Sequence, residues 1–238
     1  LQLVQPLPAY QLYEVHLRLP EHMRCDEVKE YYDILSSRKG SLIAKRLFDF
    51  VVSLLMTIVI SPILLILIIL IKVDDPGPAF FRQVRVTTNG REFRIFKFRT
   101  MVINAEKLGA QVTQENDPRV TKIGHKLRKY RLDELPQLLN VITGDMSFVG
   151  TRPEVPRYVA CYSKEMLATL LLPAGVTSEA SITYKDENEL IGSAKNPDEV
   201  YVDKVLPEKM KYNLDALRNF SFLGEIKTML KTVGAVIK

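Results

Sequence analysis

An uncharged stretch of 22 residues, FVVSLLMTIVISPILLILIILI, runs from Phe50 to Ile71. As an α-helix it would be roughly 33 Å long, against about 30 Å for the hydrocarbon core of a bilayer. Ser61 and Pro62 interrupt it near its middle. Pro62 has no amide hydrogen and its ring crowds the carbonyl of Ile58, so we expect a break or a kink there. The sequence therefore predicts a membrane helix that is broken at Ser61-Pro62.

Basic residues flank this stretch on both sides. Lys45 and Arg46 precede it, and Lys72 follows it together with several arginines further on. Because positive charge stays on the cytoplasmic side of membranes, neither end is typical of a translocated one. This pattern favours a re-entrant hairpin that enters and returns to the same face. A kinked helix that crosses the bilayer and a buried core helix of a soluble protein are the two alternatives.

The composition of the chain limits the classes of partner that it can bind. The net charge is +5 and the isoelectric point is about 9.1. Such a balance suits nucleic acid, an anionic membrane surface or phosphorylated substrates. With a membrane segment present, we expect membrane lipids and phosphorylated substrates, and no nucleic acid. Cys25 and Cys161 lack the spacing of a metal site and give no sign of a disulfide framework.

The remaining pattern predicts an α+β fold that is mainly helical. Two strand-like runs at 79–87 and 91–98 meet at Asn89-Gly90, the strongest short-range signal for a β-hairpin. We expect residues 173–206 to be mostly loop, and 222–237 to form a basic amphipathic helix that either lies on the membrane or packs on the core. The other expected helices cover 26–35, with Asp26 as a cap, and 120–129, 133–142, 163–172 and 207–219. We divide the chain into an N-terminal extension (1–40), the membrane helix (41–73) and a catalytic domain on the cytoplasmic face (74–238).

Asp133 and Glu134 are the candidate catalytic pair. Pro136 is tolerated only in a first helical turn, so the two carboxylates lie at or just before a helix start. A carboxylate that is held ionised can attack phosphorus, and its neighbour can bind Mg²⁺ together with phosphate oxygens. The plainer alternative is that Asp133 is an N-cap and Glu134 a first-turn charge, since acidic residues are common at helix starts.

Several cations are candidates for binding the phosphates of a substrate. Lys97 and Arg99 follow the second strand-like run, whereas Arg119 and Arg152 lie in loops. Arginine forks match phosphate geometry, so a diphosphate is a natural partner. Each of these cations, taken alone, is more typical of a solvated surface.

Taken together, seven short motifs resemble the bacterial sugar transferase family, the monotopic polyprenyl-phosphate phosphoglycosyl transferases. The resemblance covers about residues 41–175. In chain order the motifs are Lys45-Arg46-Leu47-Phe48-Asp49, Ser61-Pro62, Gly77-Pro78 through Phe81-Arg82-Gln83, Phe96-Lys97-Phe98-Arg99-Thr100-Met101, Asp117-Pro118-Arg119-Val120-Thr121, Leu132-Asp133-Glu134-Leu135-Pro136-Gln137, and Gly144-Asp145-Met146-Ser147-Phe148-Val149-Gly150-Thr151-Arg152-Pro153.

The resemblance implies an enzyme on the cytoplasmic face of the bacterial inner membrane. It would move a sugar-1-phosphate from a UDP-sugar to polyprenyl (undecaprenyl) phosphate, as a first membrane step of polysaccharide or glycoconjugate synthesis such as exopolysaccharide or lipopolysaccharide. Asp133 would form a phosphosugar-aspartyl intermediate while UMP leaves, and Glu134, with Asp133, would hold Mg²⁺. The competing functions are a non-catalytic membrane-anchored binding protein and an aspartyl phosphatase-like hydrolase. The sequence leaves the sugar and the oligomeric state, a homodimer included, open.

Overall fold

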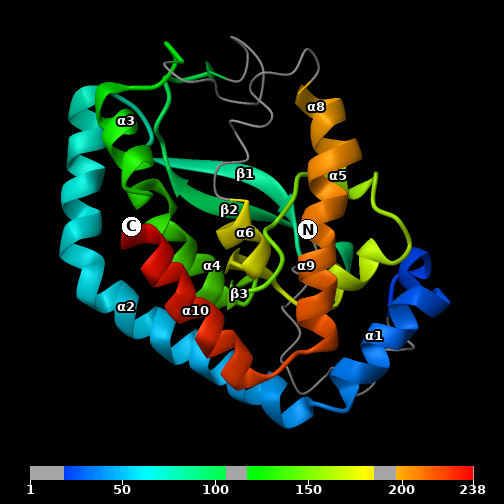
Figure 1. The fold of residues 1–238 in the computed structure, drawn as a ribbon. Coiled ribbons are helices and arrows are strands. Elements are labelled where there is room, and N and C mark those ends of the chain that lie inside the picture. The colour runs from blue at the N-terminus through cyan, green and yellow to red at the C-terminus, as the bar shows by residue number, and fades with distance from the viewer. Residues whose placement is uncertain (1–18, 106–116, 185–196, 238) are drawn as a thin grey trace.

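The computed structural model describes residues 19–105, 117–184 and 197–237. Its longest element is α2 (Lys39–Asp74), which curves round one side of the molecule (Figure 1). We expected a break or a kink at Ser61-Pro62. The break is wrong, because α2 is one continuous helix with Pro62 inside it, and the helix is bent instead (Figure 1). The carbonyl of Ile58, which Pro62 cannot bond, accepts a hydrogen bond from Ser61 Oγ at 2.8 Å. This side-chain bond replaces the missing backbone bond, so the helix bends without ending.

Most of the apolar side chains of α2 face outward. Val59 is 75% exposed and Val73 is 77% exposed, and many of the side chains between them are also exposed. Among the described residues, α2 is the one helix long and apolar enough to cross a membrane. A buried core helix would hide these side chains, so that alternative is wrong.

The two strands β1 (Phe80–Val86) and β2 (Glu92–Phe98) form the predicted antiparallel hairpin. The turn Thr88–Gly90 joins them, with positive φ angles at Asn89 (59°) and Gly90 (75°). Asn and Gly tolerate this left-handed backbone best, which explains why this pair marks the turn. The hairpin packs on the second half of α2, where Phe98 shares a buried cluster with Leu67 and Ile71.

The other predicted helices are present with small shifts. α1 (Asp26–Ser36) has Cys25 at its N-cap position, so Asp26 is a first-turn residue and the predicted cap is wrong. The helices α3 (Lys122–Lys129), α9 (Leu206–Arg218) and α10 (Phe222–Ile237) follow the expected ranges closely. The predicted helix 133–142 divides into the 3-10 segment η5 (Leu132–Gln137) and α4 (Leu138–Thr143), and 163–172 contains η6 (Met166–Leu171).

Residues 173–206 were expected to be mostly loop, and this is wrong for much of their described part. β4 (Ala174–Thr177) pairs in parallel with β3 (Met146–Val149), and the short helices α6 (Glu179–Thr183) and α8 (Pro197–Val200) follow. A π-helical segment, η7 (Tyr201–Val205), then joins α8 to α9. The rest of that range, 185–196, lies outside the described residues. A short 3-10 turn (η2, Glu21–Met23) and α5 (Pro156–Val159) complete the elements.

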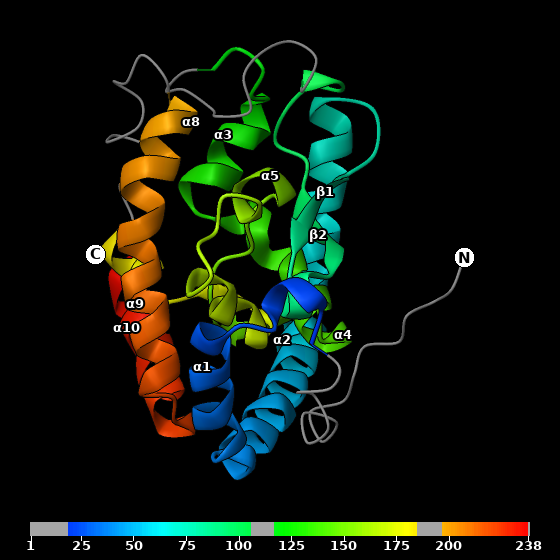
Figure 2. The same ribbon diagram turned by 90° about the vertical axis from the view of Figure 1, so that its right-hand side faces the viewer.

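The helices α8 and α9 lie on the side of the molecule opposite α2, with the hairpin, α3 and α4 between them (Figures 1 and 2). α1 packs with η6 and α9 in one buried cluster, which includes Tyr31, Leu171 and Leu217. α10 lies along the first half of α2, where Phe222 contacts Phe48 with ring centroids 5.6 Å apart. The buried side of α10 thus packs on the core, while its Leu223, Leu230 and Val233 side chains remain exposed.

Candidate functional site

The Asp133-Glu134 pair lies in the 3-10 segment η5, immediately after a sharp reversal of the chain. Arg131 adopts a left-handed backbone (φ 53°), which is uncommon for a residue other than glycine, and this turns the chain back from α3 into η5. The neighbours of the pair, Leu132 and Leu135, pack into the buried cluster that contains Leu67 and Ile71 of α2. Apolar anchors on both sides therefore hold the two carboxylates near the apolar helix α2.

Asp133 is not an N-cap. The residue before the first turn of η5 is Arg131, and no side chain caps that end; Asp133 lies inside the turn. The plainer alternative of a capping role therefore does not apply to this carboxylate. η5 is also short and of 3-10 type, so its N-terminus favours anions less than the start of a long α-helix would.

Glu134 is held by two cations from distant parts of the chain. Its Oε1 accepts hydrogen bonds from Lys97 Nζ and from Arg152 Nη2, each at 2.9 Å. Burial alone would raise the pKa of this carboxyl, but Arg152 and Lys97 outweigh burial and hold the pKa well below its usual range. Glu134 is therefore a carboxylate throughout the physiological pH range.

Asp133 has the opposite electrostatic character. Burial raises the pKa of its carboxyl above the ordinary value, and the charge of Glu134 adds to this effect, while Lys97 and Arg128 oppose it. Arg128 is fixed beside the site by a hydrogen bond from its Nε to Thr100 Oγ1 at 2.8 Å. A carboxylate whose charge is poorly solvated is a stronger nucleophile than one in water, so this environment suits attack on phosphorus.

The β-hairpin brings both cations to Glu134. Lys97 lies on β2 itself, whereas Arg152 belongs to the loop after β3, which β1 holds in place. Arg85 Nη1 donates to the carbonyl of Pro153 at 3.0 Å, and the Val86 amide donates to the carbonyl of Glu154 at 3.0 Å. Arg85 was not among the predicted site residues. An arginine inside a strand gives no local signal that it fastens a loop beside a distant carboxylate.

The structure does not bring Arg99 and Arg119 to the pair in the same way. Arg99 is buried and forms an ion pair with Asp75, at the end of α2, with 3.1 Å between Nη1 and Oδ2. Arg119 binds Asp117, two residues earlier, with 2.6 Å between Nη2 and Oδ2. Of the four cations predicted to bind substrate, Lys97 and Arg152 thus contact the dyad, and Arg99 and Arg119 have carboxylate partners elsewhere.

The donor set fits Mg²⁺ bound together with a substrate, and not a cation cage made of protein alone. Among the described residues, no three acidic, histidine or cysteine side chains gather in one place. Mg²⁺ is commonly held by one or two carboxylates plus substrate phosphates, and Asp133 and Glu134 supply two adjacent carboxylates. Both cations on Glu134 bind the same oxygen, Oε1.

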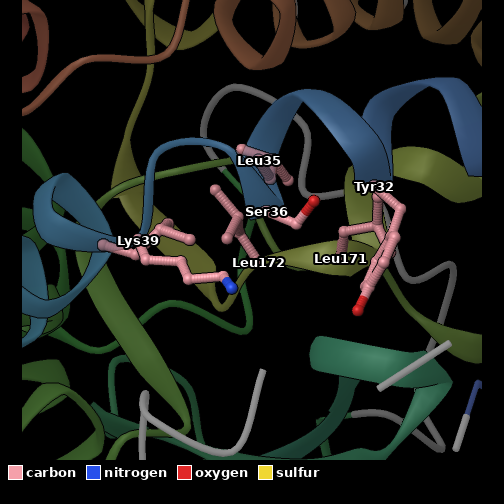
Figure 3. Close-up of a pocket in the computed structure, with 7 residues that line it drawn as sticks. Tyr32, Leu35, Ser36, Lys39, Leu171 and Leu172 are labelled. Carbon is pink, nitrogen blue, oxygen red and sulfur yellow. The ribbon is translucent and has the colours of Figure 1, made fainter. Parts of the chain in front are cut away.

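A pocket elsewhere in the molecule is not part of this site. It lies where α1, the first turn of α2 and η6 meet, and Figure 3 shows Lys39, Ser36 and Tyr32 among the side chains that line it. Its remaining lining residues are Leu35, Leu42, Leu171 and Leu172. It has no carboxylate among its lining residues, so it does not offer the chemistry found at Asp133 and Glu134.

Comparisons with known proteins agree with the pattern of the site. Residues 40–238 match the family model described as bacterial sugar transferase. The chain is 31% identical to "UDP-N-acetylgalactosamine-undecaprenyl-phosphate N-acetylgalactosaminephosphotransferase" of Aeromonas hydrophila, over 97% of this chain and 52% of that protein. It is 34% identical to "UDP-glucose:undecaprenyl-phosphate glucose-1-phosphate transferase" of Escherichia coli (strain K12), over 92% of this chain and 45% of that protein.

A relative of more similar length is the "Exopolysaccharide production protein ExoY" of Sinorhizobium fredii. It is 34% identical over 82% of this chain and 85% of its own length. By contrast, the chain spans about half the length of the A. hydrophila and E. coli relatives that it matches.

Proposed function

The chain belongs to the bacterial sugar transferase family, and we propose that it transfers a sugar-1-phosphate from a UDP-sugar to polyprenyl phosphate and releases UMP. The observation that carries this proposal is the position of the dyad. Asp133 and Glu134 lie between two leucines that pack on the membrane helix, beside cations suited to phosphate. The relatives named for undecaprenyl-phosphate transfer use UDP-N-acetylgalactosamine in one case and UDP-glucose in another, so the sugar stays unassigned.

In the proposed first step, a carboxylate oxygen of Asp133 attacks the phosphorus that bears the sugar. The bond from that phosphorus to the bridging oxygen breaks, and UMP leaves with the bridging oxygen and its electron pair. In the second step, an oxygen of polyprenyl phosphate attacks the same phosphorus. The bond to Asp133 then breaks, which restores the carboxylate and gives polyprenyl-diphospho-sugar. Two separate steps allow a polar and a very apolar substrate to use one nucleophile in turn.

Glu134 has a positioning and charge-balancing part in this scheme. Held by Lys97 and Arg152, Glu134 stays ionised, while only Asp133 forms and breaks a bond to phosphorus. Asp133 and Glu134 would hold Mg²⁺, which would neutralise charge on the phosphates of the bound nucleotide. Arg152, with 34% of its side chain exposed, can reach a substrate phosphate without leaving Glu134.

The contacts that fasten the two ends of α2 support a re-entrant arrangement in the membrane. Near its start, Lys45 Nζ donates to the carbonyl of Val149 at 2.9 Å, and Asp49 accepts from Ser147 Oγ at 2.7 Å. At its last residue, Asp74 accepts from the Ile123 amide at 2.9 Å. Both ends bind one folded domain, which favours a bent re-entrant helix over a full crossing. This shared attachment, together with the basic residues on both sides of the apolar stretch, supports a domain on the cytoplasmic face of the inner membrane, in contact with lipids.

Cysteine labelling tests this topology. In a background with Cys25→Ser and Cys161→Ser, we expect Ser37→Cys and Pro78→Cys both to react with an impermeant maleimide from the cytoplasmic face of sealed vesicles. The matched control is Val59→Cys, which is 75% exposed in the protein alone and should be protected by lipid from either side. Reaction of Ser37→Cys and Pro78→Cys from opposite faces would show a full crossing and contradict the re-entrant arrangement.

The pH dependence of the first step tests the nucleophile. Because burial raises the pKa of Asp133 above the ordinary value of 3.8, UMP release should fall with decreasing pH at a midpoint above that value. Arg128 stabilises the ionised form, so Arg128→Gln should raise the pKa of Asp133 and move the midpoint to higher pH. Pre-steady-state UMP release between pH 4 and 8 measures both. Lys129→Gln, an exposed neighbour, is the control; equal shifts in both variants would argue against a local effect on Asp133.

A direct assay separates the proposed function from the two competing ones. Purified protein would be mixed with Mg²⁺, undecaprenyl phosphate and each of a panel of UDP-sugars, and UMP, inorganic phosphate and lipid product would be measured. We expect UMP and a lipid-linked sugar diphosphate in equal amounts for at least one UDP-sugar. Inorganic phosphate without lipid product would indicate a hydrolase. No turnover with the whole panel would favour a binding protein.

A further inference from the structure

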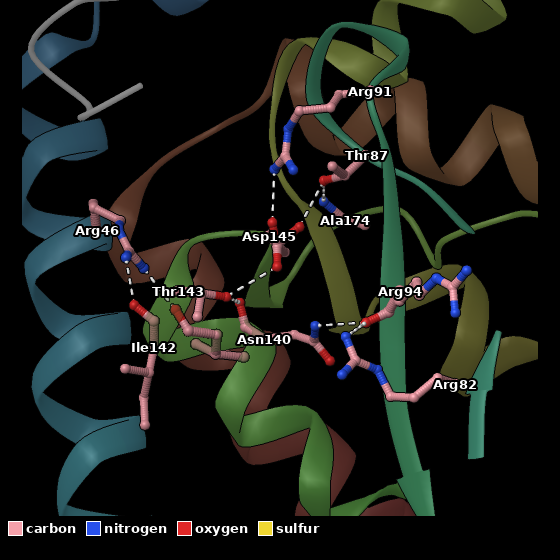
Figure 4. A network of polar contacts seen from close by, with 11 residues as sticks. Arg46, Arg82, Thr87, Arg91, Arg94, Asn140, Ile142, Thr143, Asp145 and Ala174 are labelled. Carbon is pink, nitrogen blue, oxygen red and sulfur yellow. Dashed lines mark hydrogen bonds and ion pairs between the residues drawn. The ribbon is translucent and has the colours of Figure 1, made fainter. Parts of the chain in front are cut away.

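The side chain of Asn140, on α4, occupies the outer edge of β2. Its Oδ1 accepts a hydrogen bond from the Phe96 amide at 2.8 Å, and its Nδ2 donates to the carbonyl of Arg94 at 3.2 Å. Figure 4 shows the carboxamide aimed at the Arg94 carbonyl. Asn140 is only 1% exposed. One fully buried side chain thus uses both its donor and its acceptor on the backbone of a single strand.

These two backbone groups are the pair that a third strand would bond. Within the described residues, β2 has only β1 as a strand neighbour, so its other edge is open. A buried backbone group that lacks a hydrogen-bond partner destabilises the fold. A leucine at position 140 would remove this partner from the Phe96 amide, and it would leave the Arg94 carbonyl with Arg82 Nη2, which donates to it at 3.1 Å. The carboxamide bonds both groups and fixes how β2 lies on α4.

The bonded strand positions lie next to the lysine that holds Glu134. Lys97 follows Phe96 directly, and its Nζ bonds Glu134 Oε1 at 2.9 Å. Glu134 lies on η5, which runs straight into α4, the helix that carries Asn140. A closed loop of contacts therefore runs from Asn140 through Phe96 and Lys97 to Glu134, and returns along the chain to Asn140.

We propose that Asn140 is a positioning residue for the reaction, which sets the register and distance of β2 so that Lys97 meets Glu134. This inference rests on the proposed function of the dyad. Asn140 itself touches neither carboxylate, and it acts through Lys97. Loss of Asn140 should therefore weaken the energetic coupling between Lys97 and Glu134. Loss of a residue that only supports the fold would leave this coupling unchanged.

Thr87 provides a matched control at the other end of the hairpin. It too is 1% exposed and bonds two backbone groups: its Oγ1 donates to the Asp145 carbonyl at 2.6 Å and accepts from the Ala174 amide at 3.2 Å. Figure 4 shows these contacts of Thr87 in the upper part of the view, with Asn140 below them. Thr87→Val and Asn140→Leu remove comparable buried bonds, but only Asn140 lies next to the Lys97 strand position.

The first experiment needs no enzymatic activity. The variants Lys97→Met, Glu134→Gln and their combination would be made in the wild-type, Asn140→Leu and Thr87→Val backgrounds, and the unfolding midpoints of the purified proteins compared. Non-additivity of the two changes measures the Lys97–Glu134 coupling. We expect it to fall by at least half in Asn140→Leu and to be retained in Thr87→Val. Equal coupling in all three backgrounds would overturn the proposal.

Asn140→Asp keeps the experiment decisive if Asn140→Leu does not fold. The aspartate retains an acceptor for the Phe96 amide but, when ionised, has no donor for the Arg94 carbonyl. We expect it to reduce the Lys97–Glu134 coupling by less than the leucine would. Coupling at the wild-type value in a folded Asn140→Asp protein at neutral pH would contradict a role for the complete carboxamide.

The second experiment uses UMP release with the UDP-sugar that supports turnover. Small displacements of site residues cost on the order of 10²-fold, so we expect Asn140→Leu to lower kcat/KM by about 10- to 100-fold. In the Lys97→Met background the same change should cost less than about twofold, because the residue through which Asn140 acts is gone. An equal loss in both backgrounds would refute the proposal. Absence of UMP release by the wild type would refute the proposed function alone, since the unfolding experiment still decides the role of Asn140.

Discussion

Asp133→Asn is expected to lower UMP release by at least about 10⁴-fold, the scale seen when one member of a covalent catalytic group is removed. The amide has nearly the same shape as the carboxyl but no nucleophilic charge. The anchors on either side, Leu132 and Leu135, remain in their buried cluster, so the fold should be retained. Initial rates of UMP release at saturating UDP-sugar, with unfolding midpoints measured alongside, check this expectation.

Asp145→Asn is the matched control for that variant. Asp145 bonds Arg91 at 2.8 Å and has 21% of its side chain exposed, and it lies at the turn end of the hairpin, apart from the dyad. The same chemical change there should alter UMP release by less than about threefold. If Asp133→Asn kept more than a tenth of the wild-type rate, a covalent role for this carboxylate would be untenable.

Lys45→Met should lower the free energy of unfolding by about 3–5 kcal/mol, because breaking a buried ion pair leaves an uncompensated charge. Lys45 is 5% exposed and binds the Val149 carbonyl and the Glu225 carboxylate, with Asp49 3.9 Å away. These contacts join the start of α2 to β3 and α10. Methionine fills a similar volume, so most of the loss should come from the stranded carboxylates.

Lys72→Met provides the comparison, since Lys72 flanks the apolar stretch on the other side and is exposed. Its replacement should change stability by no more than about 0.5 kcal/mol. Denaturant unfolding of both variants in the same detergent measures the difference. Equal effects would mean that the charge near the membrane matters and the buried contacts of Lys45 do not.

Local signals in the sequence were sufficient for the hairpin and for the long helix. Asn89-Gly90 is a turn that few other residue pairs can form, and an uncharged run from Phe50 to Ile71 has few structural alternatives. The sequence left a break and a kink at Pro62 as alternatives, and the hydrogen bond of Ser61 Oγ to the Ile58 carbonyl, which the sequence does not show, accompanies the continuous helix. The strands β3 and β4 were missed because each has four residues and β3 is buried throughout, which removes the alternation that marks a strand.

For the site, the sequence identified the dyad and candidate cations but not their partners. Lys97, Glu134 and Arg152 meet only because the hairpin and the loop after β3 converge, which is a property of the tertiary fold. Arg99 and Arg119 have the same charge as Arg152 in the same kind of motif, yet each has a nearby aspartate as its partner. Residue type predicts what a side chain can bind, whereas the fold decides which partner it meets.

The covalent step itself is tested most directly by the intact mass of the protein after brief exposure to the panel of UDP-sugars with Mg²⁺ and without a lipid acceptor. We expect the mass to rise by one sugar phosphate, with the added mass on the peptide that contains Asp133, and to return to its starting value when undecaprenyl phosphate is added. If a UDP-sugar that supports lipid-product formation left the mass unchanged at every time point, and UMP appeared only when the lipid was present, direct transfer between the two substrates would replace the covalent route.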